Sequence, residues 1–392
     1  MRLERLLILV PLSLLALFPE TVRGGTASPS CGATVVPGTQ VQAALRRERR
    51  GATICVSSGT YSVAVQLLPR TGQTIVGVGP TPPLLRCRAL FCFDGSKGPA
   101  SVTLSRLILE GARDADVRKG DGWRIAGVEA RRAGVAGIEV RGDGTVIRDS
   151  YVHHNGEFGI RAVFATNLRV VGTEIAFNPT DPNASTGFSG GLKLNGVIGV
   201  EVLSSNVHDN GGGAGIWLDI DTQNFRLAAN KSLDNAGDGI RVETSCNGTL
   251  ESNTIQGTST IGIDLFNSHD VTVSGNAIVM ADGALYGIRM LSNGRSGSHG
   301  TGACMTNGAY ENSGNVADSN DLRQTSVATR DGVVDNGGMT SGNRWESNVY
   351  QVPDCLATSW QWWDGVSEQT VSFAEWINLG ADLTGSCTAL PP

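Results

Sequence analysis

The sequence predicts an all-β solenoid, a parallel β-helix, and the first reason is a short repeat. The pattern of glycine, an aliphatic residue, any residue and a second aliphatic residue opens at Gly191, Gly215 and Gly239, which are 24 residues apart. The pattern continues in both directions, as GIEV, GIRA, GIDL and GIRM. A repeat of roughly 20 to 50 residues is typical of solenoids, whose units stack because none can bury its apolar face alone.

The second reason is the content of each repeat. Every unit holds two or three short β-rich runs separated by Asn, Gly, Asp and Ser, with no amphipathic helical run among them. The 52 glycines and the 6% aromatic content fit a turn-dense coil, and the net charge of -6 argues against a nucleic-acid binder. A solenoid grows by adding turns, so we expect one coil domain.

The chain is expected to begin with a secretory signal peptide at residues 1–28. Arg2 and Arg5 precede an apolar segment from Leu6 to Phe18, and small residues up to Ser28 offer a cleavage site. This segment is too short to span a bilayer. We therefore expect a secreted, extracellular protein that is free of the membrane after cleavage.

Residues 29–65 are expected to form an N-terminal cap and the first strand. The run VQAALRRERRG predicts an amphipathic helix, with Val41, Ala44 and Leu45 on one side and exposed arginines on the other. Because the open edge of a solenoid invites aggregation, a helix laid across the first coil is the expected arrangement.

The parallel β-helix itself is expected over 66–295, followed by a C-terminal loop and tail over 296–392. The tail holds five of the seven tryptophans, namely Trp345, Trp360, Trp362, Trp363 and Trp376. We expect them to pack over the last coil; a sugar-binding platform is the alternative.

All eight cysteines follow the signal peptide, and an even number in an exported chain predicts disulfides. Closeness in sequence suggests three pairs, Cys31 with Cys55, Cys87 with Cys92, and Cys355 with Cys387.

A helix, then ICVSSGTY, then LLPRTGQTIVGVG, then coils punctuated by Asn and Gly resembles the pectate-lyase-like right-handed parallel β-helix superfamily, from about Cys31 to the end. The resemblance implies a right-handed coil and a polysaccharide partner. It fixes no reaction, because that superfamily includes pectate and alginate lyases, polygalacturonases, epimerases and phage tailspikes.

Candidate site residues follow from the alternation of side chains along a strand. The aliphatic residues of each repeat fill the coil, so the residues between them face outward and stack in columns. The first outward column is Glu139, Arg161, Lys193, Trp217, Arg241, Asp264 and Arg289, and the second contains Asn195, Asp219 and Glu243. Asp221 belongs to a third, and the turns of 191–243 are expected to carry one charged patch.

Two reactions fit this patch. For hydrolysis, Asp219 and Glu243 on neighbouring turns suit a retaining pair, and Asp219 with Asp221 suits an inverting pair. For elimination from a uronate, Lys193 or Arg241 is the candidate base. Asp219, Asp221 and Glu243 are then the ligands of a Ca²⁺ ion.

Other side chains have supporting roles. Trp217 is expected to be exposed and to stack on a sugar, and Arg161, Asn195, Arg241 and Asp264 to bind substrate. His208 is a candidate acid or base at the rim. Carboxylates beside Lys193 are expected to raise its pKa, which argues against it as the base.

An insertion at 178–187 comes directly before Lys193 and is expected to overhang the patch. The sequence therefore predicts a monomeric, exported enzyme that cleaves a polysaccharide, with a slight preference for β-elimination over hydrolysis. A glycan-binding β-helix without activity is the third alternative, and an exposed ladder of salt bridges is the simplest explanation of the charges.

Overall fold

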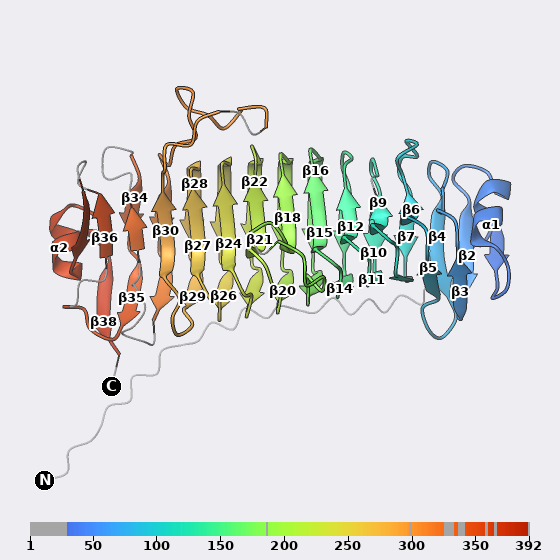
Figure 1. Ribbon diagram of the computed structural model, residues 1–392, viewed down its shortest axis with the longest axis horizontal. Coiled ribbons are helices and arrows are strands. Elements are labelled where there is room, and N and C mark those ends of the chain that lie inside the picture. Colours follow the sequence, from blue (N-terminus) through green and yellow to red (C-terminus); the bar gives the residue numbers. More distant parts are fainter. Residues whose placement is uncertain are drawn as a thin grey trace, which may run out of the picture. The chain divides into compact units, whose positions relative to one another are not determined.

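The computed structural model describes residues 30–118, 120–185, 187–297, 300–324, 333–335, 342–356, 360–363 and 367–390. The predicted signal peptide lies outside these residues. Over the rest, the chain winds into a long coil of three parallel β-sheets, which runs from β2 to β36 in Figure 1. No helix among the described residues is long and apolar enough to cross a membrane.

Between residues 74 and 363, each turn of the coil gives one strand to each sheet, in the order A, B, C. Sheet A comprises β1 (Ala33–Val35), β2 (Thr53–Ser57), β4 (Thr74–Val78), β7 (Thr103–Ser105), β10 (Arg124–Ala126), β13 (Val146–Arg148), β16 (Thr166–Val171), β19 (Ile198–Leu203), β22 (Gln223–Ala228), β25 (Cys246–Glu251), β28 (His269–Ser274), β31 (Val316–Asp318) and β34 (Arg344–Glu346). Sheet B comprises β3 (Thr60–Val63), β5 (Leu84–Cys87), β8 (Ile108–Glu110), β11 (Glu129–Arg131), β14 (Tyr151–His153), β17 (Glu174–Ala176), β20 (Asn206–His208), β23 (Lys231–Leu233), β26 (Thr254–Gln256), β29 (Ala277–Val279), β32 (Asp321–Arg323), β35 (Val349–Val352) and β38 (Ser386–Ala389).

Sheet C comprises β6 (Phe91–Asp94), β9 (Ala115–Arg118), β12 (Ala136–Val140), β15 (Phe158–Val163), β18 (Gly190–Asn195), β21 (Ala214–Asp219), β24 (Asp238–Glu243), β27 (Ile261–Phe266), β30 (Tyr286–Leu291), β33 (Val333–Asp335), β36 (Trp360–Trp363) and β37 (Glu368–Val371). The strands pair in parallel, apart from the antiparallel pair β36 and β37. Strands after residue 296 thus extend all three sheets.

The repeat pattern has a direct structural reason. Its first aliphatic residue points into the coil, where Ile160, Leu192 and Ile216 belong to one continuous core. Its glycine lies where the following strand of sheet B comes close, because a Cβ at Gly159 would meet the side chain of Ile175 on β17 at 2.4 Å. The pattern therefore records close packing between sheets B and C.

Two files of buried asparagines run along the coil at its corners. Between sheets B and C, the amide of Asn155 donates to Asn178, which donates to Asn210, which donates to Asn235, over 3.0–3.1 Å. The stacking of Asn155, Asn210 and Asn235 expected from their register is confirmed, and Asn178 joins them.

The second file lies between sheets A and B and ends differently. It links Asn230, Asn253, Asn276, Asn320 and Asn348 over 2.9–3.0 Å. The amide of Asn348 donates to the carboxylate of Asp382, 3.0 Å away. Each asparagine amide binds the amide of the next turn in place of a water molecule, so the buried polar groups at the corners have hydrogen-bond partners.

The three disulfides predicted from closeness in sequence are confirmed. The fourth joins Cys246 on β25 to Cys304, which lies 58 residues further along the chain. Cys304 belongs to the excursion 292–312, which projects from the coil after β30 (Figure 1).

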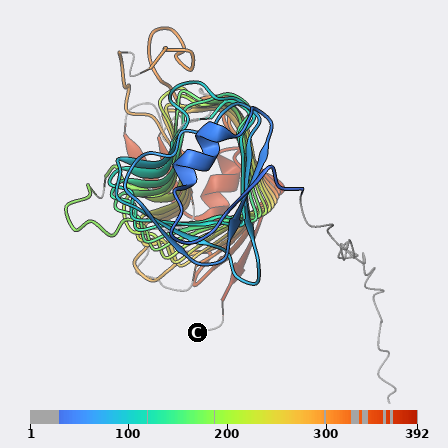
Figure 2. The same ribbon diagram turned by 90° about the vertical axis from the view of Figure 1, so that its right-hand side faces the viewer.

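One helix lies at each end of the coil. Figure 2 shows α1 (Val41–Arg47) across the first turns, and its Val41 and Leu45 are part of the core. At the other end, α2 (Phe373–Asn378) buries Trp376 against Trp345, with ring centroids 5.8 Å apart. The protective effect of α1 on the open edge of the coil stays a prediction.

Candidate active site

The outward face of sheet C carries the charged residues predicted from the repeat. Parallel pairing places Arg161, Lys193, Trp217, Arg241 and Asp264 opposite one another on consecutive strands from β15 to β27. Glu139 and Arg289 extend this row at its two ends. The predicted register of the first column is confirmed, because the aliphatic residues on both sides of each member are held in the core.

Lys193 is the most unusual member of the row. Its side chain is almost fully buried, although it lies on the outer face of β18. The Lys193 Nζ lies 3.1 Å from Asp219 Oδ2, 3.1 Å from the centroid of the Trp217 ring, and 4.7 Å from the Phe188 ring. An ammonium group thus lies between two aromatic rings and one carboxylate.

Burial lowers the pKa of Lys193 below its ordinary value, although Asp219 and Glu243 act in the opposite direction. The prediction that the neighbouring carboxylates raise this pKa is confirmed for their own contributions. The objection to Lys193 as the base left out the loss of water around the ammonium, which disfavours the charged form and is the larger effect. A lysine with a lowered pKa can serve as a general base near neutral pH.

Asp219 holds the Lys193 ammonium and is itself held by the backbone. Its Oδ1 accepts hydrogen bonds from the Ile220 N–H at 2.8 Å and the Thr244 hydroxyl at 3.4 Å. Asp219 lies opposite Asn195 on β18. These contacts fix the carboxylate at the end of β21, so Lys193 has one preferred position.

Trp217 was expected to be exposed, and this is wrong, because only 5% of its surface is accessible. Lys193 lies over its ring, and the guanidinium of Arg241 lies 5.1 Å from the ring centroid. Trp217 therefore supports two cations, and its ring offers little open surface to a sugar. The buried Trp217 Nε1 and Asn195 Oδ1 have no hydrogen-bond partner among the described residues.

Glu243 is paired with two cations. Its Oε1 accepts a hydrogen bond from Arg295 at 2.7 Å, and its Oε2 lies 3.1 Å from the Nε of Arg241. The next carboxylate in the row, Asp264, is fully buried and accepts two hydrogen bonds of 2.8 Å from Arg289.

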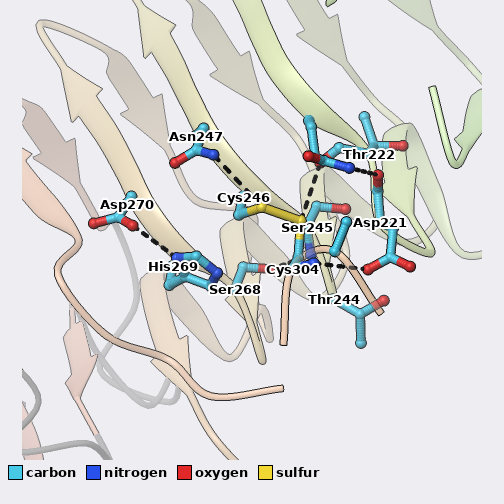
Figure 3. Close-up of a disulfide and its surroundings, with 12 residues drawn as sticks. Asp221, Thr222, Thr244, Ser245, Cys246, Asn247, Ser268, His269, Asp270 and Cys304 are labelled. Carbon is cyan, nitrogen blue, oxygen red and sulfur yellow. Dashed lines mark hydrogen bonds and ion pairs between the residues drawn. A yellow bond between two sulfur atoms is a disulfide. The ribbon is translucent and has the colours of Figure 1, made fainter. Parts of the chain in front are cut away.

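Asp221 has a different position from the other candidates. Its carboxylate accepts hydrogen bonds from Gly302 N–H at 2.7 Å, Cys304 N–H at 3.0 Å and the Tyr310 hydroxyl at 3.1 Å. Figure 3 shows this carboxylate beside the disulfide of Cys304 and Cys246. Asp221 thus anchors the excursion 292–312, whose Arg295 reaches the site.

His208 lies on β20 in sheet B, and its contacts do not include the Lys193 group. Its ring nitrogens lie 2.8 Å from Asp209 Oδ2 and 3.2 Å from Glu174 Oε1. The structure thus separates His208 from the residues of sheet C with which the sequence grouped it.

Phe188, the residue directly after the insertion 178–187, contributes to the site. It lies against Phe158, with ring centroids 5.5 Å apart, and over Lys193. Phe188 is 40% exposed and covers the ammonium from outside, whereas the overhang of residues 178–187 themselves stays a prediction.

Sequence reasoning missed Asp238, at the start of β24. Burial and the neighbouring Asp264 raise its pKa to about 7, and Arg241 lies 3.7 Å away. A signal was present, because Asp238 continues a column occupied by Phe158, Gly190 and Ala214 on the preceding strands. A carboxylate in a column whose other members carry no charge is a candidate functional group.

The three carboxylates predicted as Ca²⁺ ligands do not converge. Asp219 is bound to Lys193, Glu243 to two arginines, and Asp221 to the excursion. Among the described residues, no group of three His, Cys, Asp or Glu is arranged to hold a metal ion. Calcium dependence stays an untested prediction, and we derive no step through this ion.

The comparisons with known proteins agree on the architecture. A family model described as a right handed beta helix region matches residues 117–278. No curated protein sequence matches the chain.

Several solved structures share the fold. The Dettilon tailspike protein gp208 is 16% identical, with a TM-score of 0.58 over 79% of this chain, which spans 64% of the tailspike. Pectate lyase Pel9A is 15% identical, with a TM-score of 0.50, and the match covers 77% of this chain and 79% of the lyase. The A-module of the Azotobacter vinelandii mannuronan C-5 epimerase AlgE4 is 18% identical, with a TM-score of 0.52 and coverages of 76% and 86%. At these identities the likeness concerns the fold alone.

Proposed function

Since the chain is a right-handed parallel β-helix protein, as pectate lyase Pel9A and the mannuronan epimerase module are, we propose that it acts on a polysaccharide. More specifically, it cleaves a uronate-containing glycan by β-elimination on the outward face of sheet C. The observation that carries this proposal is Lys193, a buried lysine with a lowered pKa that lies among cations able to receive carboxylates.

The row of cations on this face offers partners to an anionic chain. Its five cations, Arg161, Lys193, Arg241, Arg289 and Arg295, are matched by five carboxylates within 4.0 Å, so the cation that is least engaged decides where a sugar carboxylate binds. Arg161 is the most available, because its closest carboxylate, on Glu139, is 3.9 Å away. It is the proposed partner of a sugar carboxylate, with Arg241 as the second.

Elimination asks for a base beside the carbon that bears the carboxylate. The neutral Lys193 amine takes the proton from this carbon, and the C–H electron pair forms a double bond to the neighbouring carbon. The glycosidic C–O bond at that neighbour breaks, its electron pair goes to the leaving oxygen, and a proton from water completes the new hydroxyl. The arginines stabilise the negative charge that develops on the substrate carboxylate.

The other predicted residues position these groups. Asp219 orients the Lys193 amine, and Trp217 supports Lys193 and Arg241 from below. The unpartnered Asn195 Oδ1 and Trp217 Nε1 are suited to sugar hydroxyls, because buried polar atoms need a partner. Phe188 has to move aside for a sugar to reach the amine.

Hydrolysis is less well supported than elimination. The predicted pair, Asp219 and Glu243, is occupied by Lys193, Arg241 and Arg295. A carboxylate held in ion pairs is poorly suited to donate a proton to a leaving group. The four disulfides and the proposed signal peptide fit an exported enzyme.

The test uses the purified mature protein and a panel of polyuronates and neutral glycans. Absorbance of the unsaturated uronate product and release of reducing ends are followed together, with and without EDTA. We expect absorbance to grow on a polyuronate, and Lys193→Gln to abolish it while Lys231→Gln, an exposed lysine on sheet B, leaves it unchanged. Reducing ends without absorbance would replace elimination by hydrolysis, and no product on any glycan would favour a binding protein.

A further inference from the structure

A second cluster of chemically active side chains lies on the outward face of sheet B. Pairing places Ile108, Glu129, Tyr151 and Glu174 opposite one another on β8, β11, β14 and β17. Adjacent rungs are about 4.8 Å apart, so Glu129 and Glu174 flank Tyr151 on both sides. The four residues line a cavity of about 400 Å³, with Pro82 and Val128 among its apolar walls.

Aromatic stacking fixes the ring of Tyr151. The imidazole of His153 stacks on it at a centroid distance of 3.9 Å and an interplanar angle of 16°. His153 is itself buried, and its Nε2 lies 3.3 Å from Glu129 Oε1. Since Tyr151 lines the cavity and His153 covers one side of the ring, the other side is left for a ligand.

The second carboxylate is held in the same manner. His208 Nε2 lies 3.2 Å from Glu174 Oε1, and the ring of Phe177 lies 5.7 Å from that of His208. Each glutamate of the groove thus has one imidazole behind it. This arrangement holds the carboxylate oxygens in place on both sides of Tyr151.

The hydrogen-bonding groups that remain point to hydroxyls as partners. Each glutamate has two oxygens with several acceptor positions, of which the imidazoles use a part. The Tyr151 hydroxyl makes no hydrogen bond to a described residue, and burial with the two glutamates raises the pKa of Tyr151, which keeps it a donor.

The charges of the groove are largely compensated locally. Arg131 forms an ion pair with Glu129, and Arg148 lies 2.8 Å from Asp149 at the rim. An anionic uronate chain would meet three carboxylates here, whereas a neutral sugar meets acceptors and an aromatic face. The groove therefore differs from the face of sheet C, where Arg161 has no carboxylate of a described residue closer than 3.9 Å.

We infer that this groove on sheet B, formed by Glu129, Tyr151 and Glu174, is a binding site for a neutral oligosaccharide. Sugar hydroxyls donate to the two carboxylates, and the apolar face of one sugar ring packs on Tyr151. The site is independent of the proposed reaction on sheet C. It gives the protein a second contact to a mixed glycan, which bears both neutral and uronate residues.

The test titrates neutral hexasaccharides of β-linked glucose, xylose and mannose, and a hexagalacturonate, by calorimetry. We expect at least one neutral hexamer to bind with a Kd at or below about 1 mM. Tyr151→Ala should weaken this binding at least about tenfold, whereas Tyr151→Phe, which keeps the ring and loses only the hydroxyl donor, should weaken it less than Tyr151→Ala does. Glu174→Gln tests the hydroxyl acceptor and should weaken binding in the same direction.

The two sites fail separately in this design. Lys193→Gln should leave binding of the neutral hexamer unchanged, and Tyr151→Ala should leave turnover of a short polyuronate unchanged. Absence of neutral binding at about 10 mM, or equal affinity of Tyr151→Ala and the wild type, overturns the groove as a sugar site. Circular dichroism and thermal melting confirm that each variant keeps its fold.

Discussion

Replacing Asp219 with Asn tests whether Lys193 acts as a base. The side chain keeps its shape, and its oxygen can still accept from the Ile220 N–H, while the negative charge 3.1 Å from the ammonium is lost. That charge raises the pKa of Lys193, so its removal should lower this pKa further. An opposite charge this close typically shifts a pKa by about 1 to 3 units, which corresponds to roughly 1.4 to 4 kcal/mol.

The assay is the pH dependence of kcat/KM for the unsaturated product. Because the neutral amine is the active form, the rate of the wild type rises with pH through the pKa of Lys193. In Asp219→Asn the rising limb should move to lower pH by about 1 to 3 units. Glu201→Gln, which removes an exposed carboxylate paired with Arg169 on sheet A, should not move it.

Nuclear magnetic resonance of labelled lysine gives a second readout that needs no substrate. The Lys193 resonance should titrate at a lower pH in Asp219→Asn than in the wild type. A rising limb and a resonance that both stay in place, or that both move to higher pH, would refute the coupling on which the proposed base depends.

Three further predictions concern the stability of the coil. Asp116 is fully buried, and burial raises its pKa from 3.8 to about 8. Between these pH values the folded chain therefore binds a proton that the unfolded chain releases. The stability that this proton provides is complete below about pH 4 and is lost as the pH rises toward 8. Chemical denaturation should show that the free energy of unfolding of the wild type is lower at pH 9 than at pH 5 by an amount on the order of a few kcal/mol, and that this difference is smaller in Asp116→Asn. An equal pH dependence of the wild type and the variant would contradict the assignment. Changing both Cys246 and Cys304 to Ser, or Asp221 to Ala, should make the excursion 292–312 sensitive to limited proteolysis, while circular dichroism shows an intact coil. The disulfide closes a chain loop, and this closure is worth roughly 4 kcal/mol of chain entropy. Unfolding of the coil together with cleavage would argue against a local tether. Leu45→Ala in α1 should lower the free energy of unfolding by about 2 to 5 kcal/mol and promote aggregation. Arg46→Ala, at an exposed position of the same helix, should change the free energy of unfolding by no more than about 0.5 kcal/mol. Equal thermal melting of the two variants would contradict a capping function of α1.

Much of the architecture could be predicted from the sequence, because it depends on residues close together in each repeat. The glycine and aliphatic pattern places Lys193, Trp217 and Arg241 in register, since a shift of one residue would turn the core aliphatics outward. The three short-range disulfides follow from the same locality.

The remaining features depend on contacts that no local pattern records. Asp221 receives its partners from residues more than 80 positions away. Cys304 is joined to Cys246 on β25, one turn before the turn of β28, β29 and β30 from which the excursion leaves the coil. Lys193 is buried by Phe188, from a loop, and by the ring on the next turn. The lowered pKa of Lys193 could therefore not be predicted from the sequence, because desolvation depends on which groups cover a residue and not on its neighbours in sequence.

The asparagine file that ends at Asp382 gives the coil a chemical direction. Every amide in it donates to the next member toward the C-terminus and also to a carbonyl of the preceding turn, so each member needs an acceptor ahead of it. A terminal asparagine would have one N–H for which no following amide provides an acceptor. Asp382 accepts from Asn348 and from the Tyr350 hydroxyl at 2.7 Å, and a carboxylate has no hydrogens of its own to place. An acidic residue at this point thus ends the asparagine file just before β38, the last strand of sheet B, and a longer file would call for an amide there instead.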